Sequence, residues 1–353
     1  PLSIRWSGKL VPTVTGKYTF YFTTDDGCRL FLDGKLLIDS WYVRAAKADE
    51  VTVELTAGKA YRLTAEYFDD GGERSAKLAW RMPELDRRDF LDLYGEAGEA
   101  VRSCDVTVAV VGINKSIERE GQDRTTIELP QDQQVFIQEV YKANPNTVVV
   151  LVAGSSLALH WENAHIPALL NAWYPGEQGG TAVAEALFGD YNPGGRLPLT
   201  YYNALEELPP FDDYDIRKGR TYQYFKGNPL YPFGYGLSYT DFAYQKLNVR
   251  TEADTLWVDF TLANAGKRDG DEVAQVYIQF PQTEEQMPVK QLKGFRRVTV
   301  MKGKKVKVSI PICKQDLRIW DEQQEKFVTP SGKYNILVGA SSADIRLQEV
   351  VEL

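Results

Sequence analysis

The hydrophobic period of the chain changes twice along its length. From residue 1 to about residue 84, apolar and polar residues alternate over strand-length runs separated by turn residues, as a β-sandwich requires. Between about residues 90 and 200, helical spacing alternates with continuous apolar runs. From Tyr239 onward, the alternation of single residues returns. The sequence therefore predicts a multidomain protein in which an α/β segment lies between two all-β segments.

The first segment is predicted to be a β-sandwich domain over residues 1–86. Its clearest turn signal is Asp33-Gly34, which stands between the apolar runs RLFL and KLLI. A two-residue type I′ turn needs a positive φ at both central residues, and Asp-Gly supplies them readily. We therefore predict a β-hairpin at this point.

The central segment is typical of a parallel sheet and is predicted to form an α/β sandwich domain over residues 87–204. The runs DVTVAVVG and TVVVLVAG are apolar on both faces and alternate with helical patterns, which predicts strands covered on both sides. Ligands of such sheets bind at the loops that follow the carboxyl ends of the strands. The loop from Gly112 to Pro130 should lie at that edge.

The remaining residues are predicted to form an ordered linker and a second β-sandwich. Residues 205–238 have no clear period, but their many aromatic side chains favour packing over free movement. Residues 239–353 alternate again, which predicts an immunoglobulin-like or fibronectin type III-like sandwich.

Charge and composition exclude several classes of function. A net charge of −8 and a pI near 5.1 leave no basic surface for phosphates, so nucleic acid is not an expected partner. No apolar run is long enough to span a bilayer, and no membrane partner is expected. The chain begins without Met and without a secretion signal, so we expect a mature or excised part of a longer protein. The three cysteines are far apart and are predicted to be isolated buried thiols.

Charged side chains are concentrated in the loop SIEREGQDR after the first apolar run of the α/β segment. Glu118, Glu120 and Asp123 could act in proton transfer, but a charged loop is often only solvated. Its arginines, among them Arg124, could pair with these carboxylates and brace the loop. The residues alone leave both interpretations open.

Other templates for chemistry are weak. His160 and His165 are predicted to be structural, because no nucleophile motif accompanies them. GEQGGT lacks the spacing of a phosphate-binding loop and is predicted to be a tight turn before a helix. Asp25-Asp26 supplies too few oxygens for Ca²⁺ and is predicted to be a turn. We predict no cofactor and no metal site.

Three blocks of the chain resemble the C-terminal half of glycoside hydrolase family 3, the β-glucosidases and β-xylosidases. They are REGQDRTTIELPQDQQVFIQEVYKANPNTVVVLVAGS, AWYPGEQGGTAVAEALFGDYNPGGRLPLTYY and YPFGYGLSYTDFAY. EVAQVYIQF followed by LKGFRRVTVMKGK is similar to the fibronectin type III-like terminal domain of that family. The first segment resembles the protective-antigen-type β-sandwich that some members carry as an insertion in the α/β domain.

The resemblance implies a retaining mechanism with two carboxyl groups. The family's Asp nucleophile lies on a (β/α)8 barrel that this chain lacks, and the α/β domain would be incomplete at its start. The family's acid/base Glu stands in an E-G-x-D-R context, which falls on Glu120. A general acid must hold its proton at working pH, which a nearby carboxylate favours. Glu118 could supply that charge or could itself be the acid, while Asp123 and Arg124 are interpreted as a brace.

The resemblance thus implies the C-terminal portion of an exo-acting β-glycosidase that acts on oligosaccharides or aryl β-glycosides. It implies a secreted or periplasmic enzyme, and we expect the chain without its barrel to be inactive. Trp41 and Phe68 of the first module could stack on a sugar, or could be core residues. The alternative is a non-catalytic carbohydrate-binding or adhesion protein built of β-sandwich modules.

Overall fold

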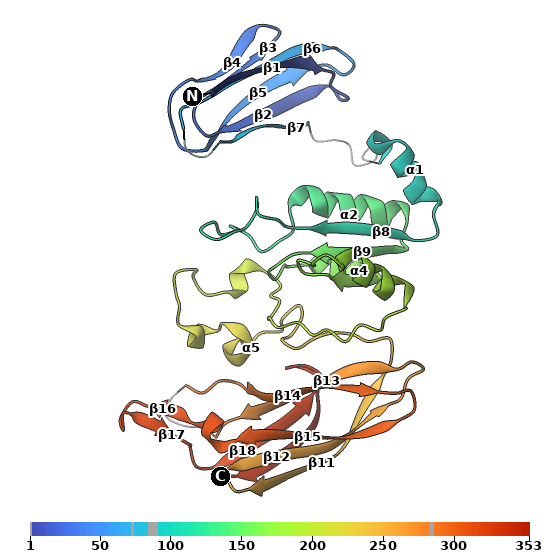
Figure 1. Ribbon diagram of the computed structural model, residues 1–353, viewed down its shortest axis with the longest axis vertical. Helices are drawn as coiled ribbons and strands as arrows, with labels where there is room; N and C mark the ends of the chain where they lie inside the picture. Colours follow the sequence, from blue (N-terminus) through green and yellow to red (C-terminus); the bar gives the residue numbers. More distant parts are fainter. Residues whose placement is uncertain (1, 72–73, 84–90, 282–285) are drawn as a thin grey trace. The chain divides into compact units, whose positions relative to one another are not determined.

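The computed structural model describes residues 2–71, 74–83, 91–281 and 286–353. The chain divides into two compact units, Pro1–Ser103 and Cys104–Leu353. Strands dominate both units, and most of the helices lie in the stretch between the two all-β segments (Figure 1). The predicted combination of all-β and α/β parts is confirmed.

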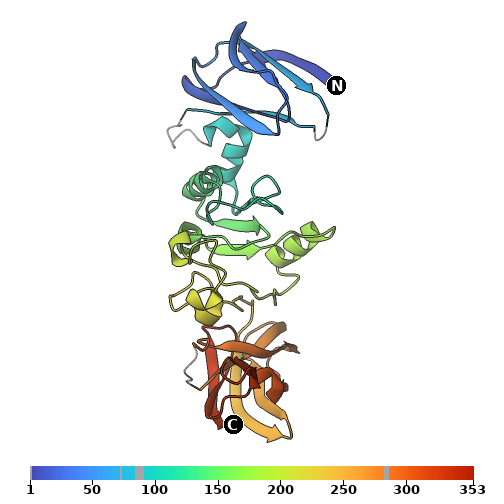
Figure 2. The same ribbon diagram turned by 90° about the vertical axis from the view of Figure 1, so that its left-hand side faces the viewer.

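The first unit contains a sandwich of two antiparallel sheets (Figure 2). Their strand orders are β1-β6-β3-β4 and β5-β2-β7. Alternate side chains of β2 enter the core, where Tyr18, Phe20 and Phe22 are buried. This burial of every second residue is the physical origin of the alternation in the sequence. The elements of the unit are β1 (Leu2–Leu10), β2 (Gly16–Thr24), β3 (Cys28–Leu32), β4 (Lys35–Ser40), β5 (Lys47–Leu55), β6 (Tyr61–Asp69), β7 (Ala76–Arg81), η2 (Asp92–Tyr94) and α1 (Glu96–Ser103).

The predicted hairpin joins β3 to β4. Asp33 has φ 50° and Gly34 has φ 84°, so both central residues adopt the positive φ of a type I′ turn. The Asp33 side chain also accepts a hydrogen bond of 2.7 Å from the backbone N–H of Arg62. The turn is therefore fixed both by its own residues and by the neighbouring strand β6.

A three-stranded parallel sheet of order β10-β9-β8 begins the second unit. Ile137 of helix α2 is buried in one cluster with Ala109 and Val111 of β8. The helix therefore covers one face of the sheet. The elements are β8 (Thr107–Gly112), α2 (Gln131–Ala143), β9 (Thr147–Val152), α3 (His160–His165), β10 (Ala168–Asn171) and α4 (Gly179–Phe188).

The other face of β8 differs from the prediction of a sheet covered on both sides. Val108 and Val110 point away from α2 and are 45% and 62% exposed. In the central strand β9, by contrast, Val149 and Val150 face opposite sides and are both buried. An apolar run in the sequence identifies a strand that can be buried on two faces, but it does not supply the second covering layer.

The stretch after α4 fastens the α/β part to the last sandwich. Arg196 forms an ion pair of 3.0 Å with Glu272, and both side chains are nearly fully buried. Tyr222 stacks on Phe233 with ring centroids 4.3 Å apart, and its hydroxyl accepts a hydrogen bond from the backbone N–H of Leu292. Tyr222 therefore packs both within this stretch and against β14. The short helices of this stretch are η3 (Leu205–Glu207), η4 (Ile216–Lys218) and α5 (Thr221–Tyr224).

The last sandwich packs the sheet β11-β12-β15 against the sheet β14-β13-β18-β19. Its core includes Leu256, Phe260, Val276 and Ile336, all buried. A small hairpin of two strands, β16 and β17, lies outside these sheets. The elements are β11 (Phe242–Glu252), β12 (Thr255–Asn264), β13 (Gly270–Gln279), β14 (Gln291–Val300), β15 (Lys305–Cys313), η5 (Lys314–Leu317), β16 (Ile319–Asp321), β17 (Lys326–Val328), β18 (Lys333–Gly339) and β19 (Ile345–Glu352).

None of the helices in the described ranges combines the length and the apolar character that a transmembrane span needs. The observation agrees with the absence of a long apolar run in the sequence.

Candidate functional site

The candidate site is the loop of residues 113–130, which leaves the carboxyl end of the parallel strand β8 as predicted. Gly112 has φ 155°, and a Cβ atom at this position would lie 1.8 Å from the carbonyl oxygen of Val152 on β9. Glycine is therefore required where the loop begins. The Gln133 side chain on α2 bonds to both the N–H and the C=O of Gly112, each at 2.8 Å. Strand β9 and helix α2 together fix the start of the loop.

A tight turn forms the tip of the loop. The backbone groups of Arg119 and Gln122 bond to each other in both directions, with N···O distances of 3.1 and 3.0 Å. Gly121 adopts φ 74°, a conformation that a side chain would disfavour. The two residues at the tip are therefore Glu120 and Gly121.

Glu120 is exposed at this tip. Within the described parts of the chain, its carboxylate forms no hydrogen bond or ion pair. It is consequently available to a group from outside these residues. The geometry is compatible with a proton donor that meets its substrate only in the complete protein, because an acid must be able to reach the atom that it protonates.

Glu118 is held in place. Its Oε2 forms an ion pair of 2.8 Å with Arg124 Nε, and both of its carboxylate oxygens lie within 2.9 Å of Ser155 Oγ. Arg124 Nη2 also donates to Ser155 Oγ at 2.9 Å and to the carbonyl oxygen of Ser156 at 3.1 Å. Arg124 thus connects two segments of the loop and the end of β9, and its carboxylate partner is Glu118.

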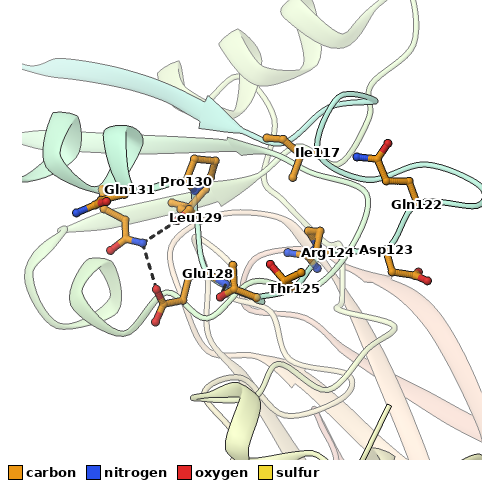
Figure 3. Close-up of a pocket in the computed structure, with 11 residues that line it drawn as sticks. Ile117, Gln122, Asp123, Arg124, Thr125, Glu128, Leu129, Pro130 and Gln131 are labelled. Carbon is orange, nitrogen blue, oxygen red and sulfur yellow. Dashed lines mark hydrogen bonds between the residues drawn. The ribbon is translucent and has the colours of Figure 1, made fainter. Parts of the chain in front are cut away.

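Asp123 has a different position from the one that a brace would need. Its side chain is exposed and makes no ion pair among the described residues. It lines an open pocket of about 650 Å³ between the loop and the start of α2, together with Arg124 and Glu128. Figure 3 shows Asp123 and Arg124 on one side of this pocket and Glu128 on the other. Glu120 does not line it.

The two aromatic candidates of the first module lie side by side. The rings of Trp41 and Phe68 are 4.8 Å apart in a tilted arrangement, and the Arg29 guanidinium lies 4.7 Å from the centroid of Trp41. Trp41 is 36% exposed. Its neighbours Tyr42 and Val43, which the sequence analysis did not single out, are 55% and 63% exposed. Trp41 and Phe68 therefore form an aromatic pair beside the cation of Arg29.

The weaker templates have structural explanations. His165 stacks on Trp161 with ring centroids 4.4 Å apart. In GEQGGT, a Cβ at Gly179 would lie only 2.4 Å from the Pro175 side chain, so the chain turns tightly here. The Asp26 carboxylate accepts hydrogen bonds from the backbone N–H groups of Arg44 and Asp70, which lie in two other segments of the first unit.

Metal ligands and thiols add no further site. Among the described residues, no group of three or more His, Cys, Asp or Glu is arranged to hold a metal ion. The prediction of buried thiols holds for Cys28, which is buried, and is wrong for Cys104, which is exposed.

Ser155 is the member of this site that sequence reasoning missed. It follows β9 by three positions, just as the charged loop follows β8. Because neighbouring parallel strands end at one edge of a sheet, a pair of serines directly after the second apolar strand was the available signal.

Comparison with known families supports the resemblance seen in the sequence. The model of the glycosyl hydrolase family 3 C-terminal domain matches residues 13–239. The model of a fibronectin type III-like domain matches residues 272–342. The first match covers more than half of the chain, and the second lies within the last sandwich.

Curated relatives and solved structures agree with these matches. A xylan 1,4-beta-xylosidase of Xylanibacter ruminicola is 39% identical over 269 residues, which is 73% of this chain and 31% of the relative. A periplasmic beta-glucosidase of Salmonella typhimurium is 36% identical over 290 residues, 78% of this chain and 37% of the relative. The crystal structure of a β-glucosidase from Kluyveromyces marxianus in complex with glucose superposes with a TM-score of 0.77 at 29% identity, over 99% of this chain and 44% of that one. The chain therefore spans less than half the length of each.

Proposed function

The chain belongs to glycosyl hydrolase family 3, and we propose on this basis that it forms the C-terminal part of an exo-acting retaining β-glycosidase, either a β-glucosidase or a β-xylosidase. The two relatives named for these activities support both choices of sugar. The substrate would be an oligosaccharide or an aryl β-glycoside. The nucleophile would come from a barrel domain outside this chain. We therefore expect the 353-residue chain alone to be inactive.

Retaining hydrolysis needs two carboxyl groups about 5 Å apart. One attacks the anomeric carbon, while the other protonates the leaving oxygen and later removes a proton from the incoming water. We assign the second role to Glu120. In the first step its carboxyl proton passes to the glycosidic oxygen as the C–O bond breaks. In the second step its carboxylate accepts the proton of the water that displaces the enzyme's carboxylate.

One observation carries the choice of Glu120 over Glu118. The Glu118 carboxylate is engaged by Arg124 and by Ser155, whereas the Glu120 carboxylate is exposed at the tip of the turn without a partner among the described residues. A carboxylate that is already bound by a guanidinium and a hydroxyl is not free to reach the oxygen atom that an acid must protonate. Glu118 therefore suits a structural role, and Glu120 suits the chemistry.

The other parts of the chain have supporting roles in this proposal. Trp41 and Phe68 of the first module would offer an apolar face to a sugar ring of the substrate. The last sandwich would support the α/β part through the buried Arg196–Glu272 pair. The name of the Salmonella relative supports a periplasmic or secreted location.

The test is the Glu120→Gln variant of the full-length enzyme. Glutamine keeps the shape of the side chain but cannot donate the proton. We expect kcat/KM for substrates with poor leaving groups to fall about 10²- to 10⁴-fold, the range that general acid catalysis contributes. Aryl glycosides with acidic phenols should be affected far less in kcat/KM, because their leaving groups need little protonation. Added azide, which attacks without a general base, should accelerate turnover of these aryl substrates.

Glu118→Gln is the matched comparison, because it removes a carboxylate two residues away. If Glu118→Gln shows the dependence on leaving group and Glu120→Gln does not, the acid is Glu118. If both variants retain full activity on poor leaving groups, neither residue is the acid, and the assignment of this loop fails.

A further inference from the structure

Three side chains from two separate segments meet at the base of the turn that carries Glu120. Glu118 precedes the tip, Arg124 follows it, and Ser155 lies beyond the end of the neighbouring strand β9. The Arg124 and Glu118 side chains are only 11% and 23% exposed. The contacts of this triad are therefore partly shielded from water, which makes hydrogen bonds between charged groups stronger than at an open surface.

Ser155 occupies the centre of the triad. Its single hydroxyl proton can be donated to either oxygen of Glu118, at 2.9 and 2.7 Å, while its oxygen accepts the N–H of Arg124 at 2.9 Å. The hydroxyl thus binds both ends of the turn at once. Arg124 adds a second attachment to the same segment through the carbonyl oxygen of Ser156.

We propose that Ser155 is a positioning residue for Glu120, which it fixes by clamping Glu118 and Arg124 to the carboxyl end of β9. This inference rests on the proposed role of Glu120 as the proton donor. The Glu120 side chain itself has no partner among the described residues, so its place is set by the backbone of the turn. Displacing a reacting group by about 1 Å can cost roughly 10²-fold in rate, so such a clamp has a catalytic consequence.

The structure of the turn is tested first, on the 353-residue chain, by hydrogen–deuterium exchange. The amides of Arg119 and Gln122 bond across the turn and should be protected. In Ser155→Ala we expect their exchange to accelerate about tenfold, as for the loss of one hydrogen bond to a charged group. Peptides from the last sandwich should be unaffected, which shows that the variant is folded.

Two further variants separate the hydroxyl from other effects. Ser155→Thr keeps the hydroxyl and should restore the protection of the turn. Ser156→Ala is the matched control, because Arg124 binds the backbone carbonyl of Ser156, which the substitution leaves in place. It should exchange like the wild type.

The catalytic consequence is tested in the full-length enzyme. Ser155→Ala should reduce kcat/KM about 10- to 100-fold for substrates with poor leaving groups and far less for activated aryl glycosides. A loss of folded protein would reduce the measured activity on both substrate classes equally. A larger fall in kcat/KM for the poor leaving groups therefore distinguishes a positioning role from an effect on stability. Ser155→Thr should recover kcat/KM for substrates with poor leaving groups. Ser156→Ala should leave kcat/KM unchanged for both substrate classes.

The outcomes separate this inference from the proposed function. Unchanged exchange in Ser155→Ala overturns the clamp, whatever the kinetics show. Faster exchange in Ser155→Ala with an equal loss of kcat/KM for both substrate classes overturns the positioning role. In that case Glu120→Gln still tests independently whether Glu120 is the proton donor. A Glu120→Gln variant that is fully active on poor leaving groups overturns the proposed function itself.

Discussion

The buried ion pair between Arg196 and Glu272 makes a quantitative prediction about how the last sandwich is joined to the α/β part. The two groups are 3.0 Å apart, and their side chains are 8% and 4% exposed. Arg196→Met keeps most of the aliphatic stem but removes the charge, so that Glu272 loses its ion-pair partner in a site with almost no water. Removing one member of a buried pair costs about 3–5 kcal/mol.

This cost converts into a large shift of the unfolding temperature. For a unit of the size of Cys104–Leu353, 1 kcal/mol corresponds to about 2–4 °C, so we expect Tm to fall by roughly 6–20 °C. The double variant Arg196→Met/Glu272→Leu removes both charges and should recover most of the loss, because well-packed apolar side chains replace a buried pair at little cost.

Differential scanning calorimetry of the 353-residue chain measures these shifts, and the transition of the first unit serves as an internal reference. Arg217→Met, which removes a side chain from an exposed ion pair with Asp215, should leave Tm unchanged within error. A Tm change of less than about 2 °C in Arg196→Met, or a double variant no more stable than the single one, would refute the reasoning.

Two further predictions concern a surface and a buried carboxyl group. Trp41→Ala should weaken binding of β-linked oligosaccharides to this chain severalfold in titration calorimetry, because an aromatic face is lost; unchanged affinity would exclude Trp41 from sugar binding. Burial raises the pKa of Glu162, so the folded state holds this proton more tightly than the unfolded state. Stability therefore falls as pH rises from about 4.3, the unfolded value, through the raised folded pKa. Glu162→Gln should raise Tm at pH 7 and change it little at pH 4; a lower Tm at pH 7 would contradict this.

Much of the fold could be predicted from local patterns. The Asp33-Gly34 turn and the alternating strands of both sandwiches follow from residue-by-residue preferences, and the structure confirms them. The prediction was wrong where burial depends on a neighbour. The apolar run of β8 reads like that of β9, yet Val108 and Val110 are exposed, because no second layer among the described residues covers the face of β8 that points away from α2.

The sequence by itself placed the charged loop after a parallel strand and, through the family resemblance, selected Glu120. It could not choose the partner of Arg124, because Asp123 is adjacent in the chain and Glu118 is six residues away. The tertiary structure decided this, since a tight turn at residues 119–122 brings Glu118 back to Arg124, and the end of β9 brings in Ser155. Local preferences act within a few residues, whereas hydrogen bonds across 31 to 37 positions depend on how neighbouring strands end at one edge of a sheet.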